Sequence, residues 1–312
     1  MTRPTERSLW AGVLVAITTP FAPDGQIDHV EFVRHARWLS ERNVGGIIVG
    51  GSLGEGSALS FEERLGLVGD LVPALRADLP IVAAVGASST SDAVAQARRA
   101  EAAGARGLLV LPPYVYHGDR REVDAHFASV FRATDLPCML YNNPAAYGTD
   151  VRAEQVLDLA TEHSNLTGVK ESSGDVRRIT ALRALLGDRI DIAVGLDDAI
   201  LEGLQAGAVG WVAGLANALP EETMALFTAG RNGDSLRALE IYRWFLPLLR
   251  LDVGPKFVQQ IKLVSGELGI GTARVRLPRL ELEGTEREEV LALVRNCLSR
   301  RPGASTPGRG AP

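Results

Sequence analysis

Cysteine and lysine are scarce in this chain of 312 residues, and the scarcity of cysteine excludes several protein classes. The only cysteines are Cys138 and Cys297, too few for a disulfide framework or a cysteine-based zinc site. The five histidines have no spacing typical of metal ligands, so we expect no metal site. No block of basic residues indicates a nucleic-acid partner, and no apolar run is long enough to span a membrane. The apolar run at 10–21 lacks a small-residue cleavage site, so we expect a cytoplasmic protein.

Only three of the 33 basic residues are lysines. Lys170 follows a short apolar run at 166–169, and burying a charged amine at such a position is costly. This lysine therefore needs an explanation. Lys256 and Lys262 fall in helical segments near the C-terminal end, where we expect them to lie away from the strand ends.

Eight short apolar runs alternate with segments of helical length. Each run is almost continuously apolar, as in strands that are covered on both faces. The runs lie at 12–18, 45–50, 81–86, 107–112, 137–142, 166–171, 190–195 and 208–214. No dinucleotide-binding fingerprint follows the first run, which disfavours a doubly wound sheet. Eight such units predict an α/β fold, the (β/α)₈ or TIM barrel.

Helical patterns continue after the eighth run, near 219–229, 234–250, 254–268 and 285–299. We assign residues 1–230 to the barrel and residues 231–300 to a C-terminal helical extension of the same domain. Residues 301–312 are rich in Pro, Gly and Ser, which predicts a disordered tail.

The active site of such a barrel lies at the carboxyl ends of its strands, and Lys170 ends the sixth. An amine held in an apolar pocket has a lowered pKa, and a neutral amine is a nucleophile toward carbonyls and imines. The alternative is an ion pair of Lys170 with Glu171 or Asp175 at the rim of the barrel. Position alone leaves both interpretations open.

Two other strand ends offer complementary chemistry. The run "GSLGEGS" at 51–57 is rich in glycine, so its backbone N–H groups could bind a carboxylate, with Glu55 bracing the loop. The alternative is an ordinary turn before a helix. Tyr141, on the strand next to Lys170, could transfer protons, or could simply pack at the rim. Together these residues suit a 2-oxo acid or its cyclic imine.

Three segments resemble the signatures of the dihydrodipicolinate synthase / N-acetylneuraminate lyase family: "GSLGE" at 51–55, "YNNP" at 141–144 and "GVKESSGD" at 168–175. The similarity extends over nearly the whole chain. It implies a Schiff base on Lys170 without metal or organic cofactor, Tyr141 as proton shuttle, and a homotetramer. Ser52 is expected to be catalytic. Ser52 and the backbone amide of Leu53 are both expected to contact the substrate carboxylate. The other expected substrate-binding residues are Gly51, Gly54, Tyr116, Gly195 and Val212.

The chain departs from the synthases of that family at three places. The synthases usually have two threonines where this chain has Ser52 and Leu53. They have a relay tyrosine near Val115, which Tyr114 or Tyr116 could replace. They also place an arginine where this chain has Ala146, and its contact with a substrate carboxylate is worth about 1.5–3 kcal/mol. N-acetylneuraminate lyases typically have Asp-Glu where this chain has Asp-Asp at 197–198.

The full set of motifs, including "YRWFLPLLRLDVGPKFVQQIKL" at 242–263, resembles a subgroup that degrades hydroxyproline. That resemblance implies deamination of 1-pyrroline-4-hydroxy-2-carboxylate to 2,5-dioxopentanoate and ammonia. The first alternative is 4-hydroxy-tetrahydrodipicolinate synthase or another pyruvate-dependent aldolase. The second is a sensor that binds an oxo acid without turnover, against which the pair of Lys170 and Tyr141 argues.

Overall fold

The computed structural model describes residues 8–302, and its centre is a closed barrel of eight parallel strands. The strands are hydrogen-bonded in sequence order, and the eighth pairs with the first through Val13 and Trp211. Their bounds are β1 (Gly12–Ala16), β2 (Gly46–Val49), β3 (Ile81–Val85), β4 (Gly107–Val110), β5 (Cys138–Asn142), β6 (Leu166–Glu171), β7 (Asp191–Val194) and β8 (Gly210–Ala213). All eight lie within the apolar runs.

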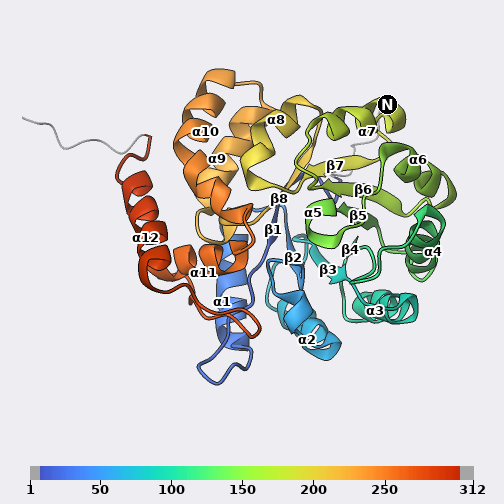
Figure 1. The fold of residues 1–312 in the computed structure, drawn as a ribbon, viewed down its shortest axis with the longest axis horizontal. Helices are drawn as coiled ribbons and strands as arrows, with labels where there is room; N and C mark the ends of the chain where they lie inside the picture. Colours follow the sequence, from blue (N-terminus) through green and yellow to red (C-terminus); the bar gives the residue numbers. More distant parts are fainter. Residues whose placement is uncertain (1–7, 303–312) are drawn as a thin grey trace, which may run out of the picture.

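Helices surround the barrel, and three more follow its last helix on one side of the molecule (Figure 1). The barrel helices are α1 (His29–Ser40), α2 (Phe61–Leu71), α3 (Thr90–Ala102), α4 (Arg120–Phe131), α6 (Ala153–Glu162), α7 (Arg177–Leu186), α8 (Ile200–Gln205) and α9 (Pro220–Arg231). The extension comprises α10 (Ser235–Leu249), α11 (Phe257–Glu267) and α12 (Gly284–Leu298). The predicted (β/α)₈ barrel with a helical extension is confirmed. The domain boundaries at 230 and 300 stay predictions, and residues 303–312 of the predicted tail lie outside the described residues.

Short elements lie in several of the loops at the carboxyl ends of the strands. The helix α5 (Pro144–Tyr147) follows β5 directly, and its first residue is a proline. The 3₁₀ turns are η1 (Gly56–Ala58), η2 (Asp197–Ala199), η3 (Leu215–Asn217) and η4 (Arg250–Asp252). Apart from η4, which joins α10 to α11, these elements follow the strands whose ends carry the candidate site residues.

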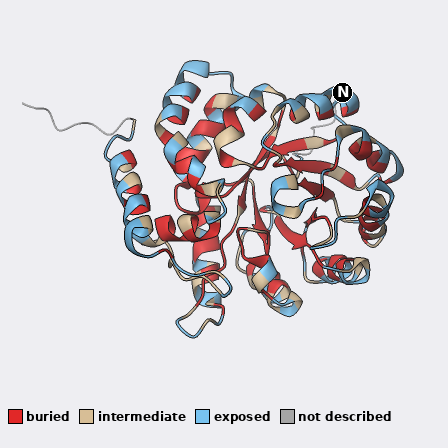
Figure 2. Ribbon diagram, in the orientation of Figure 1, coloured by how far each residue is buried: buried red, intermediate tan, exposed pale blue. Residues whose placement is uncertain are grey.

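The apolar core has two parts because the strands are covered on both faces, as Figure 2 shows by their colour. One part fills the inside of the barrel and includes Leu14, Ile48, Leu109, Met139 and Val212. The larger part lies between the barrel and its helices. Strands with two buried faces produce the continuous apolar runs of the sequence.

Trp10 closes the amino-terminal end of the barrel. Its side chain is 1% exposed, and its indole N–H donates to Thr167 Oγ1 at 2.8 Å. A Cβ atom at Gly168 would lie 2.8 Å from the Trp10 ring, and one at Gly107 would also lie 2.8 Å from that ring. Both distances are too short for any side chain. The glycines at these two positions, the first residue of β4 and the third of β6, therefore make room for the indole.

A buried ion pair joins the extension to the barrel. Lys262 on α11 is 1% exposed, and its amine donates to Glu55 Oε1 at 2.7 Å and to the Thr19 carbonyl at 2.8 Å. The expectation that Lys262 lies away from the strand ends is wrong, because its side chain extends from α11 to the loop after β2. Lys256 does lie apart, in an exposed pair with Glu286.

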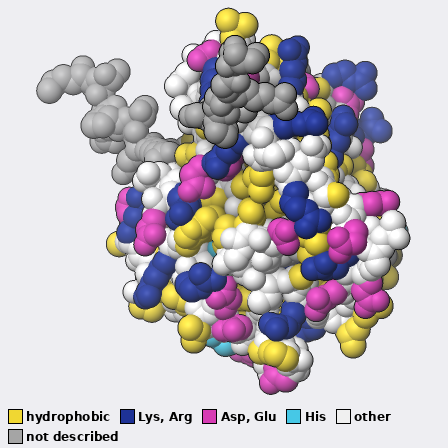
Figure 3. All heavy atoms as spheres, turned by 90° about the vertical axis from the view of Figure 1, so that its left-hand side faces the viewer, with side chains coloured by type: hydrophobic (Ala, Val, Ile, Leu, Met, Phe, Trp, Pro, Cys, Tyr) yellow, Lys and Arg dark blue, Asp and Glu magenta, His cyan; other side chains and the backbone are white. Residues whose placement is uncertain are grey.

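The surface has no strong charge of one sign on the face that carries the extension. Figure 3 shows basic and acidic side chains interspersed there. Within residues 8–302, none of the helices is both long and apolar enough to cross a membrane.

The two ion-paired lysines of the extension allow a matched test of stability. Lys262→Met should cost about 3–5 kcal/mol, because it removes the closer cation of the buried Glu55 carboxylate and leaves Arg279, 4.0 Å away, as the nearest one. Lys256→Met removes an exposed pair and should cost at most about 1 kcal/mol. Denaturant unfolding of both variants measures the difference. Equal unfolding midpoints would show that the buried pair does not hold the extension.

Candidate active site

Lys170 and Tyr141 are direct neighbours across the pairing of β5 and β6, where their Cα atoms are register partners. The Lys170 amine lies 4.1 Å from the centre of the Tyr141 ring. Both side chains are buried, at 7% and 4% exposure. Tyr141 belongs to the cluster inside the barrel, together with Val212. The register therefore places an amine beside a phenol at the carboxyl end of the barrel.

The carboxylates next to Lys170 in sequence have other partners. Glu171 accepts from Asn142 Nδ2 at 3.0 Å and from the Ser173 backbone N–H at 2.6 Å. Asp175 pairs with Arg177 at 2.7 Å. Within residues 8–302 no ion pair involves Lys170. The rim ion pair is therefore absent from this part of the chain.

Gly195 and Ser172 border the Lys170 side chain. A Cβ atom at Gly195 would lie 2.6 Å from Lys170 Cε and closer still to Ser172 Oγ. Only glycine therefore leaves room for the lysine at the end of β7. The buried Ser172 hydroxyl has no hydrogen-bond partner in the described residues. It is available to a polar atom of a bound molecule.

The phenol of Tyr141 is tuned by its neighbours. Burial acts to raise its pKa, but the charge of Lys170 and hydrogen bonds from Asn143 and Ser52 outweigh burial and lower the pKa. Asn143 Nδ2 donates to the phenol oxygen at 3.1 Å. A lowered pKa makes the phenolate more accessible, which suits a group that accepts and returns protons.

The loop after β2 presents free backbone donors. The N–H groups of Ser52 and Leu53 donate to no protein acceptor within residues 8–302. Gly51 faces open space, whereas a Cβ atom at Gly54 would lie 2.9 Å from the Ile17 carbonyl. The loop can therefore approach a ligand with its backbone and offer two N–H groups to an anion.

Glu55 holds that loop in shape. It adopts a left-handed conformation with φ 57°, which is uncommon outside glycine. Its carboxylate accepts from Lys262 and, at 3.1 Å, from the Arg276 backbone N–H. Thr19 Oγ1 donates to the Gly54 carbonyl at 2.7 Å. Glu55 thus braces the loop through residues of the extension.

Tyr147, which no motif of the sequence singles out, completes an aromatic cluster at the site. Its hydroxyl lies 2.5 Å from Ser52 Oγ. Its ring meets Tyr141 edge to face at 5.6 Å and stacks on Tyr114 at 6.0 Å. Tyr147 is the last residue of "YNNPAAY", and Pro144 begins the short helix α5 that brings it to the site. This position after the proline is the one feature of the sequence that could have indicated its role.

The other tyrosine next to Val115 lies outside this cluster. Tyr116 is 55% exposed, and its hydroxyl donates to the Glu122 carboxylate at 3.0 Å. Val115 is 89% exposed and has φ 69°. Tyr114 is the residue of this loop that the structure brings to the site. Ala146, also exposed, places no cation on α5.

Asp197, the first of the two acidic residues after β7, fixes the ends of β7 and β8. Its fully buried carboxylate accepts from Trp211 Nε1 at 2.8 Å and from the backbone N–H groups of Gly214 and Leu215. Burial raises its pKa to about 6, although these donors oppose the shift. Because its oxygens are used in this way, Asp197 acts as a brace and is not free to contact a ligand.

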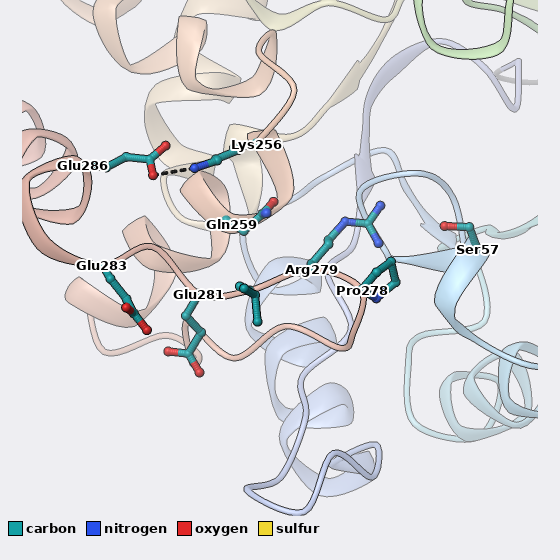
Figure 4. Close-up of a pocket in the computed structure, with 9 residues that line it drawn as sticks. Ser57, Lys256, Gln259, Pro278, Arg279, Glu281, Glu283 and Glu286 are labelled. Atoms are coloured by element: carbon teal, nitrogen blue, oxygen red, sulfur yellow. Dashed lines mark hydrogen bonds and ion pairs between the residues drawn. The ribbon is translucent and has the colours of Figure 1, made fainter.

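A cleft of about 810 Å³ lies beside the site, between α11 and the segment before α12. Figure 4 shows Arg279 in this cleft with its guanidinium toward the side of Ser57. Arg279 Nη1 lies 4.0 Å from Glu55 Oε2, so the cleft borders the loop after β2. Lys170 and Tyr141 do not line it. Within residues 8–302 there is no group of three His, Cys, Asp or Glu side chains that could hold a metal ion.

Comparisons with known proteins agree with this geometry. The model of the dihydrodipicolinate synthetase family matches residues 9–297. The 4-hydroxy-tetrahydrodipicolinate synthase of Bartonella bacilliformis is 32% identical over 287 residues, which cover 92% of this chain and 97% of that protein. The crystal structure of dihydrodipicolinate synthase from Aquifex aeolicus has a TM-score of 0.88 and 26% identity, over 92% of this chain and 98% of the other. The crystal structure of the Acinetobacter baumannii dihydrodipicolinate synthase complexed with pyruvate has a TM-score of 0.87 and 28% identity. The match covers 92% of this chain and 98% of the other.

The contact between Gly195 and Lys170 gives a test of the site. Gly195→Ala should lower the rate of reductive trapping of Lys170 by pyruvate and borohydride by about tenfold or more, because the new methyl group displaces the amine. Gly69→Ala is the control, since a Cβ atom there on α2 meets nothing within 4 Å. Unchanged trapping in Gly195→Ala would mean that the amine does not need this position.

Proposed function

The chain belongs to the dihydrodipicolinate synthetase family, and on this premise we propose that it is a lyase that binds its substrate as a Schiff base on Lys170. The observation that supports this proposal best is the buried contact of the Lys170 amine with the Tyr141 ring, 4.1 Å away. The substrate class is a small 2-oxo acid or its cyclic imine. No metal or organic cofactor takes part, because the covalent bond to the lysine supplies the electron sink.

Each neighbouring group has a role in this chemistry. The N–H groups of Ser52 and Leu53, with the Ser52 hydroxyl, bind the substrate carboxylate. Lys170 then attacks C2, and Tyr141 transfers the protons that addition and loss of water require. Gly51, Gly54, Gly195 and Val212 shape the walls of the pocket. Tyr116 binds substrate only if its loop turns inward, because its hydroxyl now pairs with Glu122.

The proposed reaction is the deamination of 1-pyrroline-4-hydroxy-2-carboxylate. Lys170 attacks the C=N carbon, and the C2–N bond breaks to open the ring and leave a Schiff base. A proton leaves C3 to form an enamine, which expels the hydroxyl group on C4 as water. After tautomerisation to an imine at C5, two molecules of water release ammonia and the lysine. The net reaction consumes one water and gives 2,5-dioxopentanoate and ammonia.

Two features support a substrate with one carboxylate. Ala146 offers no cation for a second carboxylate, and Leu53 is a buried apolar side chain, 4% exposed, beside the anion-binding loop. A compact ring suits such a pocket.

The second candidate is 4-hydroxy-tetrahydrodipicolinate synthase, the activity for which the Bartonella relative is named. One structural observation favours this reaction independently of the similarity to that relative. Arg279, which lines the cleft and lies 4.0 Å from Glu55 in the loop after β2, is a cation near that loop that could meet a second carboxylate in place of the arginine missing at Ala146. A homotetramer is proposed for either reaction, from family resemblance.

Covalent trapping tests the chemistry common to both reactions. Borohydride added with pyruvate should leave a stable adduct on Lys170, located by peptide mapping, and Lys170→Arg should form none. Lys256 and Lys262 are internal controls because both amines are ion-paired. An adduct on either of them, or no adduct with any 2-oxo acid, would overturn the proposal.

Two steady-state assays separate the candidate reactions. We expect ammonia release from the pyrroline with kcat/KM of about 10⁴ M⁻¹s⁻¹ or more, and little condensation of pyruvate with aspartate semialdehyde. Ala146→Arg should impair deamination, because a large cation would enter the space next to Tyr147. Efficient condensation without ammonia release would instead establish the synthase, and Arg279→Leu would then be expected to raise the KM for aspartate semialdehyde.

A further inference from the structure

The carboxyl group of Asp252 lies at the end of β8 and has no role in the chemistry described so far. Asp252 is part of η4, within the run at 242–263 that resembles the hydroxyproline-degrading subgroup. A Cβ atom at Gly214, the residue after β8, would lie 2.5 Å from Asp252 Cγ and 2.7 Å from Asp252 Oδ2. Only glycine at this position therefore leaves room for the carboxyl group.

The alternation of side chains along β8 places this carboxyl group on the side of the pocket. Val212 belongs to the cluster inside the barrel, whereas Ala213 belongs to the core between the barrel and its helices. A side chain at Gly214 would therefore lie on the same side as that of Val212, one step closer to the opening. Asp252 occupies that space, much as the reactive amine occupies the space beside Gly195 at the end of β7.

The carboxyl group of Asp252 has no partner. Within residues 8–302, no hydrogen bond or ion pair involves it, and because neither oxygen is fully buried, it faces open space. The carboxyl groups beside it are occupied, since Asp197 accepts from backbone N–H groups and Asp198 lies 3.9 Å from Arg250. A partly buried carboxyl group without a partner does not stabilise the fold, so its position indicates a functional use.

We infer that Asp252 is a further catalytic residue, the general acid that protonates the hydroxyl group of C4 as it leaves. The inference rests on the proposed function, because it concerns the pyrroline bound to Lys170. It names the acid that the proposed chemistry leaves unassigned. Hydroxide is a poor leaving group, and a positioned acid accelerates such a step by about 10²–10⁴-fold.

The position expected for the substrate brings C4 toward Asp252. The loop after β2 binds the carboxylate and Lys170 holds C2, so the atoms from C3 to C5 extend toward the opening of the pocket. Tyr141 is next to the lysine and transfers protons at C2 and C3. Departure of the hydroxyl group, two bonds from C2, requires a donor closer to the opening, where Asp252 lies.

Protons and electrons balance in this step. The enamine nitrogen supplies an electron pair, the C2=C3 pair becomes the C3=C4 bond, and the C4–O bond breaks with its pair on oxygen. That oxygen takes the proton of Asp252 and leaves as water. A C5–H bond then gives its proton to the Asp252 carboxylate, and its pair begins the tautomerisation to the imine at C5. Asp252 is thereby restored.

The surroundings of Asp252 favour its protonated form. Burial and the charge of Asp197 raise its pKa well above the ordinary value, and Asp198 adds to this effect, whereas the charge of Lys170 opposes it. Formation of the neutral enamine removes that opposing charge. The acid therefore holds its proton when the C4–O bond breaks.

Two substrates that differ only in the leaving group test this role. With the 4-hydroxy pyrroline, Asp252→Asn should lower kcat for ammonia release by about 10²–10³-fold. With the 4-chloro analogue it should leave kcat nearly unchanged, because chloride leaves without a proton. Asp191→Asn is the control, since Asp191 is also half-buried but bonds Ser8 at the start of β7, at the other end of the barrel. It should affect both substrates equally.

The pH profile gives a readout that a purely structural role would not change. In the natural protein, kcat on the hydroxy substrate should fall as pH rises through the raised pKa of Asp252, because the acid form is lost. This fall should be absent in Asp252→Asn, and in the natural protein with the chloro analogue. Borohydride trapping of pyruvate on Lys170 should be the same in both proteins, because it needs no acid at C4.

The outcomes separate this inference from the function on which it rests. No ammonia release from either pyrroline by the natural protein would overturn the proposed function, and the inference with it. Full activity of Asp252→Asn on the hydroxy substrate, or an equal loss on both substrates, would overturn the role of Asp252 alone. If thermal unfolding shows that Asp252→Asn folds poorly, Asp252→Ser is judged by the same ratio of the two rates.

Discussion

The pairing of β5 with β6 is the constraint on which the candidate site depends. Its register sets Tyr141 opposite Lys170, and because side chains alternate along a strand, a slip of one residue would turn one of them out of the barrel. Closure of the eight strands makes such a slip impossible without breaking neighbouring pairs. The amine and the phenol are therefore held together by backbone hydrogen bonds of the whole barrel.

A second constraint acts from outside the barrel. The loop after β2 has the shape required to present free N–H groups only because Glu55 is held by Lys262 and by the Arg276 backbone. The helical extension thus supports the site by holding this loop. Lysine is so scarce in this chain that two of its three copies, Lys170 and Lys262, are buried at positions where the amine has a specific partner.

The barrel could be predicted from the sequence because strands covered on both faces are continuously apolar, and Lys170 and Tyr141 because they end such strands. Tyr147 could not, since it lies in a helix of four residues whose orientation depends on tertiary packing. The reach of Lys262 could not be predicted either. The periodicity of α11 identifies its buried face but not the distant loop that its amine contacts. Tyr114 and Tyr116 are adjacent to the same valine, and only the folded loop shows which of them turns inward.

Trp10 determines from which end of the barrel a molecule can reach Lys170. Its indole is buried against the glycines Gly107 and Gly168, so the amino-terminal end of the barrel offers no way in, and a ligand of Lys170 reaches it from the carboxyl ends of the strands. The molecule that enters first lies deepest, and whatever reacts with it next, water or an aldehyde, arrives from one side only. The side from which a second reactant reaches a molecule on Lys170 then follows from the closed amino-terminal end of the barrel.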